Sequence, residues 1–127
     1  MRWILVIGSI FGFLSVALGA FGAHALRTRL EPRMLEVFET AVRYQMFHAL
    51  ALVAVGLAAA TGKTKELYLM GPAVCWVLGV LVFGGSLYAL VLTGIKVFGA
   101  ITPIGGVLYL AGWTWLTVVA VRAAISS

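Results

Sequence analysis

Long apolar stretches separated by short charged segments dominate the hydropathy pattern of the chain. Four intervals of 24, 19, 29 and 25 residues contain no charged side chain; they lie between Arg2 and Arg27, Arg43 and Lys63, Glu66 and Lys96, and Lys96 and Arg122. A helix needs about 20 apolar residues to cross a hydrocarbon core roughly 30 Å thick. The intervals lack the alternation typical of a membrane β-barrel. The pattern therefore predicts an all-α fold, a bundle of four transmembrane helices.

The helices are expected at about residues 3–25, 32–60, 67–93 and 98–122, within a single domain covering residues 1–127. The first stretch has some features of a signal peptide, but it is long enough to span the membrane. Pro32 suits the first turn of a helix, and nothing breaks the pattern before Gly56. The second helix should therefore carry an interfacial extension at its start. Pro103, followed by Gly105 and Gly106, predicts a kink or local opening in the fourth helix.

Small residues recur every three or four positions along the first helix, and so share one face: Gly8, Gly12, Ser15, Gly19 and Gly22. Such spacing lets two helix backbones approach closely. It predicts helix packing, either inside the bundle or between copies of the chain, and we expect a homo-oligomer. Residues 21–24 (FGAH) also resemble residues 83–86 (FGGS) weakly, which would imply two parallel helical hairpins.

Composition supports a membrane protein, since 63% of the residues are hydrophobic and 10% are charged. The net charge of +5 is carried by basic residues scattered at helix ends. This placement favours anionic lipid headgroups as partners over nucleic acid. Five cations fall at one end of the bundle and four at the other, a near tie that leaves the membrane orientation open. The single cysteine, Cys75, excludes an intrachain disulfide.

Polar side chains are concentrated toward one membrane face, where the first and third helices end and the second and fourth begin. We expect these side chains to form a pocket for a ligand or an ion; they are His24, Glu36, Glu39, Arg43, Tyr44, His48, Ser86, Tyr88, Thr102 and Pro103. Polar groups at membrane depth usually turn toward the bundle interior. Gln45 lies about 200° from Arg43 around the helix, so the two cannot share one narrow site. We expect Gln45 to be the one that faces a different helix or a neighbouring subunit.

The chemistry of this region is open. Glu39 and Arg43 have the favoured i,i+4 order for an ion pair, which could be a solvated stripe or a charged part of the pocket. His48 could be a structural hydrogen-bonding group, a proton or substrate group, or a metal or haem ligand. Two histidines are too few for a typical zinc site, and no catalytic motif is present. We therefore expect no enzyme activity, no cofactor and no metal.

Four stretches resemble the domain of unknown function 423 family of small bacterial membrane proteins, to which animal transmembrane protein 256 is related. They are GAFGAHAL (19–26), FETAVRYQMFHALAL (38–52), GSLY (85–88) and ITPIGG (101–106). The resemblance implies a four-helix protein and brings no established activity. The expected function is thus a non-enzymatic protein of the bacterial inner membrane with a lipid-, ligand- or ion-binding pocket. A small transporter or channel subunit with a discontinuous helix at Pro103, or a purely structural membrane protein, are the alternatives.

Overall fold

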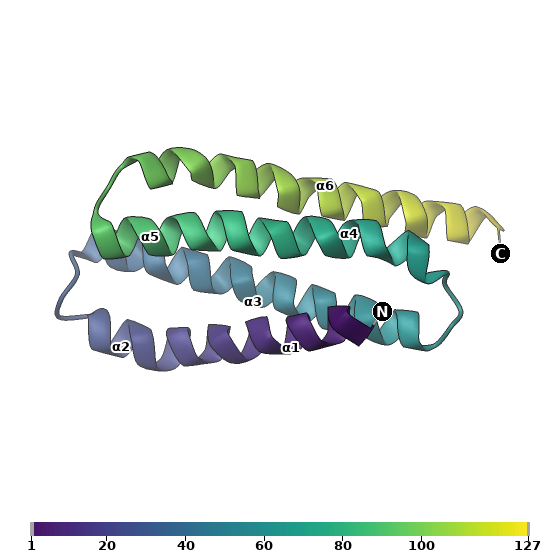
Figure 1. Cartoon of the computed structure of the whole chain (residues 1–127), viewed down its shortest axis with the longest axis horizontal. Coiled ribbons are helices and arrows are strands. Elements are labelled where there is room, and N and C mark those ends of the chain that lie inside the picture. Colours follow the sequence, from purple (N-terminus) through teal and green to yellow (C-terminus); the bar gives the residue numbers. More distant parts are fainter. Residues whose placement is uncertain (1, 127) are drawn as a thin grey trace.

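Four membrane-length helices make up the protein in a computed structural model that describes residues 2–126 (Figure 1). The first comprises α1 (Arg2–Ala17), a π-helical turn η1 (Leu18–Gly22) and α2 (Ala23–Leu26), and the second is α3 (Pro32–Ala60). The third comprises α4 (Glu66–Gly79), a π-helical turn η2 (Val80–Gly84) and α5 (Gly85–Thr93), and the fourth is α6 (Val97–Ser126). No strand occurs in residues 2–126. The predicted four-helix fold is confirmed.

The helix ends follow local chemistry. Pro32 occupies the first turn of α3, where its missing N–H group costs no hydrogen bond, and the helix then runs unbroken to Ala60. Gly62 and Gly94 adopt φ values of 72° and 71° at the ends of α3 and α5. Glycine adopts this left-handed conformation without steric cost, so it terminates both helices.

The opening expected at Pro103 is wrong, because α6 continues through this residue. A proline removes one backbone hydrogen bond, and the bonds on either side hold the helix together when neighbouring helices support it. The Thr102 hydroxyl also lies within hydrogen-bond distance of the carbonyl of Phe98, at 3.2 Å, just before the proline. The fourth helix is therefore continuous.

The helices are arranged as two hairpins that meet in the middle. Figure 1 shows α1 alongside α3, and α6 alongside α4 and α5, and the contacts between these elements agree. The two hairpins join where α3 packs against α4, η2 and α5. The core follows from this arrangement, with Ile4, Leu52, Ala73 and Trp76 fully buried at its centre. The outer helices α1 and α6 keep most of their apolar surface exposed.

The small-residue face of the first helix packs against α3 of the same chain. A Cβ atom on Gly8 would lie 2.9 Å from the Cβ of Leu52. From the other side, one on Gly56 would lie 3.1 Å from the backbone nitrogen of Leu5. Gly12, Ser15, Gly19 and Gly22 continue this face toward α2, and Ser15 is buried. The face is therefore used for helix packing inside the hairpin.

Two π-helical turns were not predicted. Each accommodates one extra residue relative to regular α-helix, and η1 and η2 end at Gly22 and Gly84. These two glycines are the matching positions of the weakly similar FGAH and FGGS segments. The likeness between the first and third helices thus extends from sequence to backbone geometry.

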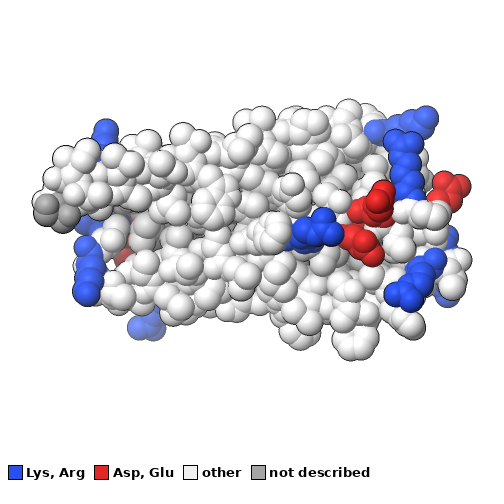
Figure 2. Space-filling view, turned by 180° about the vertical axis from the view of Figure 1, so that it is seen from behind, with Lys and Arg blue, Asp and Glu red and all other residues white. Residues whose placement is uncertain are grey.

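Charged side chains gather at the two ends of the bundle. Figure 2 shows them at both ends of one face, with a broad uncharged band between. This distribution suits a protein whose middle lies in hydrocarbon and whose ends contact headgroups and water.

Candidate functional site

A buried glutamine joins three of the four membrane-spanning helices. Gln45 of α3 is only 3% exposed. Its side-chain nitrogen donates to the backbone carbonyl of Phe11 in α1 at 3.0 Å, and its side-chain oxygen accepts from the Tyr88 hydroxyl of α5 at 2.8 Å. The Ser15 hydroxyl donates to the same Phe11 carbonyl at 2.7 Å. Gln45 therefore fixes α1, α3 and α5 relative to one another.

His48 lies one turn further along α3 and is held on both ring nitrogens. Nε2 lies 3.0 Å from the indole nitrogen of Trp113, which can only donate, so Nε2 must be the unprotonated acceptor. The hydrogen then resides on Nδ1, which donates to the carbonyl of Tyr44 at 2.7 Å. The histidine is consequently neutral, in the Nδ1–H tautomer.

Aromatic rings enclose this histidine. Its ring stacks on Tyr109 of α6, with centroids 3.7 Å apart and planes inclined by 9°. Trp76 and Trp113 approach it at an angle, and Tyr44 stacks on Phe83. The indole nitrogen of Trp76 and the hydroxyl of Tyr109 are buried without a hydrogen-bond partner in the described chain. Packing of large rings, more than hydrogen bonding, therefore holds α6 against α3.

A third polar contact links α5 to α6. The hydroxyls of Ser86 and Thr102 lie 2.7 Å apart, and each is also within hydrogen-bond distance of a backbone carbonyl, Ser86 of Phe83 at 3.0 Å and Thr102 of Phe98 at 3.2 Å. Because each hydroxyl has one hydrogen, one of them donates to the other, and the second donates to its carbonyl. Ser86 is buried, so the pair satisfies hydroxyl groups that would otherwise be costly in the membrane.

The predicted pocket is divided by the structure into buried and exposed groups. His48, Ser86, Tyr88 and Thr102 lie within the helix contacts described above, together with Gln45. His24, Glu36, Glu39 and Arg43 are exposed on their helices, outside those contacts. Gln45 faces the other helices α1 and α5, and Arg43 is exposed on the outer side of α3, away from these contacts.

Tyr44 and Pro103 border a groove on the side of the bundle between α3 and α6. The groove has a volume of about 600 Å³. Its lining is almost entirely apolar or aromatic and comprises Tyr44, Phe47, His48, Pro103, Gly106, Val107, Tyr109, Leu110 and Trp113. No group of three or more His, Cys, Asp or Glu side chains suited to a metal occurs in residues 2–126. The site is thus a sideways-facing apolar groove with His48 beneath it.

Comparison with known proteins identifies the family. The family described as protein of unknown function, DUF423, matches residues 18–106. The chain belongs to the DUF423 family.

Relatives of this DUF423 protein are themselves described as membrane proteins. The UPF0382 membrane protein of Staphylococcus saprophyticus is 42% identical over 93% of this chain and 96% of its own length. The UPF0382 inner membrane protein YgdD of Escherichia coli is 40% identical over 95% of this chain and 91% of its own length. No solved structure matches the chain. The protein is a multi-pass inner-membrane protein.

Sequence reasoning missed the part that α6 plays in this DUF423 site. From the sequence, Trp113 and Tyr109 are candidates only for interfacial anchoring or core packing. In the structure Trp113 hydrogen-bonds with His48, and Tyr109 stacks on it. One signal was present, because Gly105, Tyr109 and Gly112 share a helix face at intervals of four and three residues. All three are buried. A face that alternates glycines with an aromatic ring is typical of a close helix contact.

Proposed function

We propose that the protein is a non-enzymatic lipid-binding protein, and that the groove between α3 and α6 holds a hydrocarbon chain of a membrane lipid. The observation that carries this proposal is the groove's combination of size, apolar lining and sideways opening. A volume of about 600 Å³ is within the range of ligand sites, roughly 300–1,000 Å³.

The hydrogen bonding of His48 supports an apolar occupant. Both ring nitrogens are engaged, one by Trp113 and the other by the Tyr44 carbonyl. The groove therefore offers a ligand no free hydrogen-bonding group on the imidazole. Aromatic and aliphatic surfaces remain, and these suit a hydrocarbon chain.

Position in the membrane supports the same occupant. Trp113 lies near the middle of α6 and His48 near the middle of α3, and both helices are long enough to span the bilayer. At that depth the surroundings are lipid hydrocarbon. The abundant molecule that can reach the groove is therefore the lipid itself.

The same features favour lipid binding over the two alternatives. A transport pathway needs polar groups free to exchange partners, whereas Gln45, His48 and Ser86 are bonded to other helices or to their own backbone. A purely structural protein would gain nothing from an open groove, since filling it would add packing energy.

Gly106 provides a direct test. A Cβ atom there would meet nothing within 4 Å, and the residue lines the groove. Gly106→Leu should therefore fill the groove without disturbing the helices. In vesicles containing phosphatidylcholine with a photoactivatable acyl chain, we expect labelling of Val107 and Leu110 to fall several-fold in this variant.

Gly85→Leu is the matched control. Its added side chain also meets nothing within 4 Å, and Gly85 is exposed on α5, outside the groove. This variant should label like the unmodified protein. Equal labelling of Val107 and Leu110 in all three proteins would contradict the proposal, and ion flux through vesicles that Gly106→Leu blocks would favour a channel instead.

A further inference from the structure

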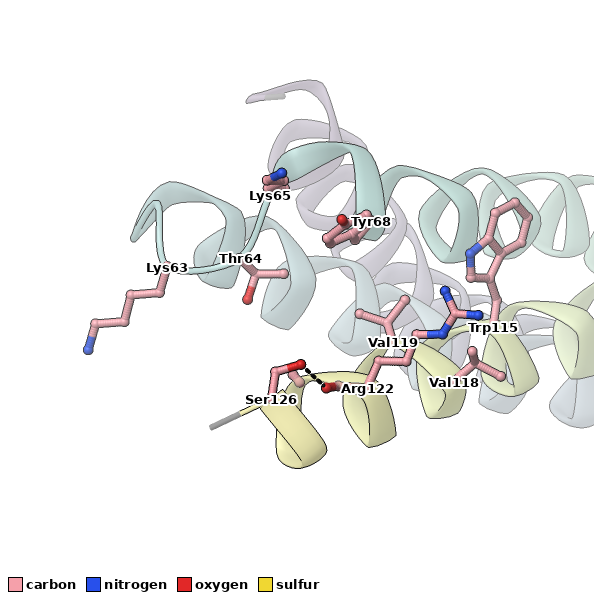
Figure 3. A pocket seen from close by; sticks show the side chains of 10 residues that line it. Lys63, Thr64, Lys65, Tyr68, Trp115, Val118, Val119, Arg122 and Ser126 are labelled. Carbon is pink, nitrogen blue, oxygen red and sulfur yellow. Dashed lines mark hydrogen bonds between the residues drawn. The ribbon is translucent and has the colours of Figure 1, made fainter.

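A second cavity lies at the opposite end of the bundle from the predicted polar face. It has a volume of about 530 Å³ and sits between the start of α4 and the end of α6 (Figure 3). Its cations are Lys63, Lys65 and Arg122, and its other walls include Tyr68, Trp115 and Val119. The cavity is therefore both strongly basic and partly apolar.

Arg122 is the key cation. Side chains on a helix lean toward its N-terminus, which for the end of α6 means toward the membrane interior. Figure 3 shows the guanidinium group turned this way, along α6 toward Trp115, while Lys63 extends outward. Glu66 is the one acidic side chain near this end of the bundle, against the three cations that line the cavity. A guanidinium directed toward lipid is costly without an anion, and the excess of cations favours one from outside the chain.

Acidic residues do not neutralise this end of the protein. Of the four acidic residues, Glu31, Glu36 and Glu39 lie at the other end, and Glu66 is the only one near the cavity. Three cations against one carboxylate leave a positive field at the membrane surface. Basic pockets between transmembrane helices are typical sites for anionic lipid headgroups.

Tyr68 places the outer part of the cavity at the level of the headgroups. It lies in the first turn of α4, and the Lys65 ammonium lies 5.9 Å from the centre of its ring. Tyrosine prefers the boundary between hydrocarbon and headgroup. The indole of Trp115 lies directly against Gly71 of α4, where a side chain would displace it, and forms the inner wall of the cavity. The lysines at the outer part are thus at the depth of lipid phosphates.

We propose that this cavity binds the phosphate of an anionic phospholipid, with Arg122 as its main ligand and Lys65 and Lys63 closing over it. The apolar walls at Val118 and Val119 would receive the upper part of the acyl chains. A bidentate guanidinium–phosphate contact is among the strongest charge-assisted hydrogen bonds. The site goes beyond the proposed function, because it lies on another face of α6 from the groove: Trp115 and Trp113 are about 200° apart around the helix.

The test compares two triple variants with the same loss of charge. Lys63→Gln/Lys65→Gln/Arg122→Gln removes the cavity's cations, and Arg27→Gln/Arg29→Gln/Arg33→Gln removes three exposed cations at the other end. Detergent-purified proteins are titrated with phosphatidylglycerol, phosphatidylcholine of the same chains, and inorganic phosphate, and bound lipid is counted by native mass spectrometry. We expect the first variant to bind phosphatidylglycerol about tenfold or more weakly, and the second to change it by less than about threefold.

Each other outcome overturns the proposal. Equal losses in both variants would mean that general surface charge attracts the lipid. Equal binding of phosphatidylcholine and phosphatidylglycerol by the unmodified protein would show that the site does not select an anion. Binding of inorganic phosphate without a preference for phosphatidylglycerol would make it a site for free phosphate. Gly106→Leu should lower the binding of phosphatidylglycerol and phosphatidylcholine equally, by removing lipid from the groove, and should leave the preference for phosphatidylglycerol unchanged. Failure of this proposal is therefore distinguishable from failure of the groove.

Discussion

Gln45 is the residue on which the packing of three helices depends. Gln45→Leu removes the bonds to the Phe11 carbonyl and the Tyr88 hydroxyl, which are both partly buried. Hydrogen bonds between membrane helices contribute about 0.6 kcal/mol on average and up to about 1.7. We expect this variant to lose about 1–3 kcal/mol of stability, measured by unfolding in mixed detergent.

Tyr88→Phe separates the two bonds. Alone it should cost about 1 kcal/mol or less, because Gln45 keeps its bond to α1. The double variant Gln45→Leu/Tyr88→Phe should lose less stability than the sum of the losses of the two single variants, since each single change already breaks the shared bond. Simple additivity would show that the Gln45–Tyr88 bond contributes nothing.

The tautomer of His48 is a second prediction at this scale. With Trp113 donating to Nε2, the ¹⁵N NMR signals of labelled protein should show Nε2 unprotonated and Nδ1 protonated. Trp113→Phe removes the donor and should allow the other tautomer to appear. Trp115→Phe, whose indole packs on Gly71, should leave the signals unchanged. An Nε2–H signal in the unmodified protein would contradict the assignment.

The sequence could identify polar residues but not which of them face inward. Arg43 and Gln45 are both polar and lie on opposite sides of α3, so one of the two had to be buried. Gln45 is buried because an amide can satisfy both of its ends with partners on α1 and α5. A buried arginine would need an anion, and α1 and α5 contain no acidic residue.

At the level of helices, the contact between α6 and η2 leaves no room for a larger side chain at Gly105. A Cβ atom on Gly105 would collide with the backbone of Phe83, whereas one on the adjacent Gly106 would meet nothing within 4 Å. Gly105→Ala should therefore lower stability by about 1–3 kcal/mol. Gly106→Ala should be neutral or stabilising by about 1 kcal/mol or less, since alanine favours helix. Thermal unfolding followed by circular dichroism would compare them, and equal values would contradict the close contact.

Helix positions were largely predictable, and helix irregularities were not. Four charge-free intervals are enough to place the helices, because the thickness of the bilayer sets their length. The π-helical turns η1 and η2 depend on contacts with other helices, so no local breaker marks them. At Pro103 the sequence predicts an irregularity that the structure lacks, because a residue that usually disturbs helices lies in the continuous α6.

For the whole molecule, both described chain ends lie at the same end of the bundle, because four helices alternate in direction (Figure 1). Five cations lie at the far end and four at the end with the termini. Small changes in charge should therefore bias the orientation. Arg27→Gln/Arg29→Gln should raise the fraction of molecules whose C-terminus is cytoplasmic, and Lys63→Gln/Lys65→Gln should lower it.

Fusions of a cytoplasm-active and a periplasm-active reporter to the C-terminus would measure these fractions. Glu31→Gln serves as a control, because acidic residues contribute little to orientation. If the fraction of molecules with a cytoplasmic C-terminus changed in the same direction in both double variants, the balance of cations between the two ends would not be what sets the orientation.

The π-helical turn η2 also has a consequence for how the chain can vary. One additional residue advances everything after it by about 100° of rotation and 1.5 Å of rise. Ser86 reaches Thr102, and Tyr88 reaches Gln45, only with that advance. The number of residues before α5 therefore determines which way the side chains of α5 face. A deletion of one residue at 80–84 would remove no polar group, and yet it would turn Ser86 and Tyr88 to a different face of the bundle. In this protein, the number of residues between two contacts carries as much information as their identity.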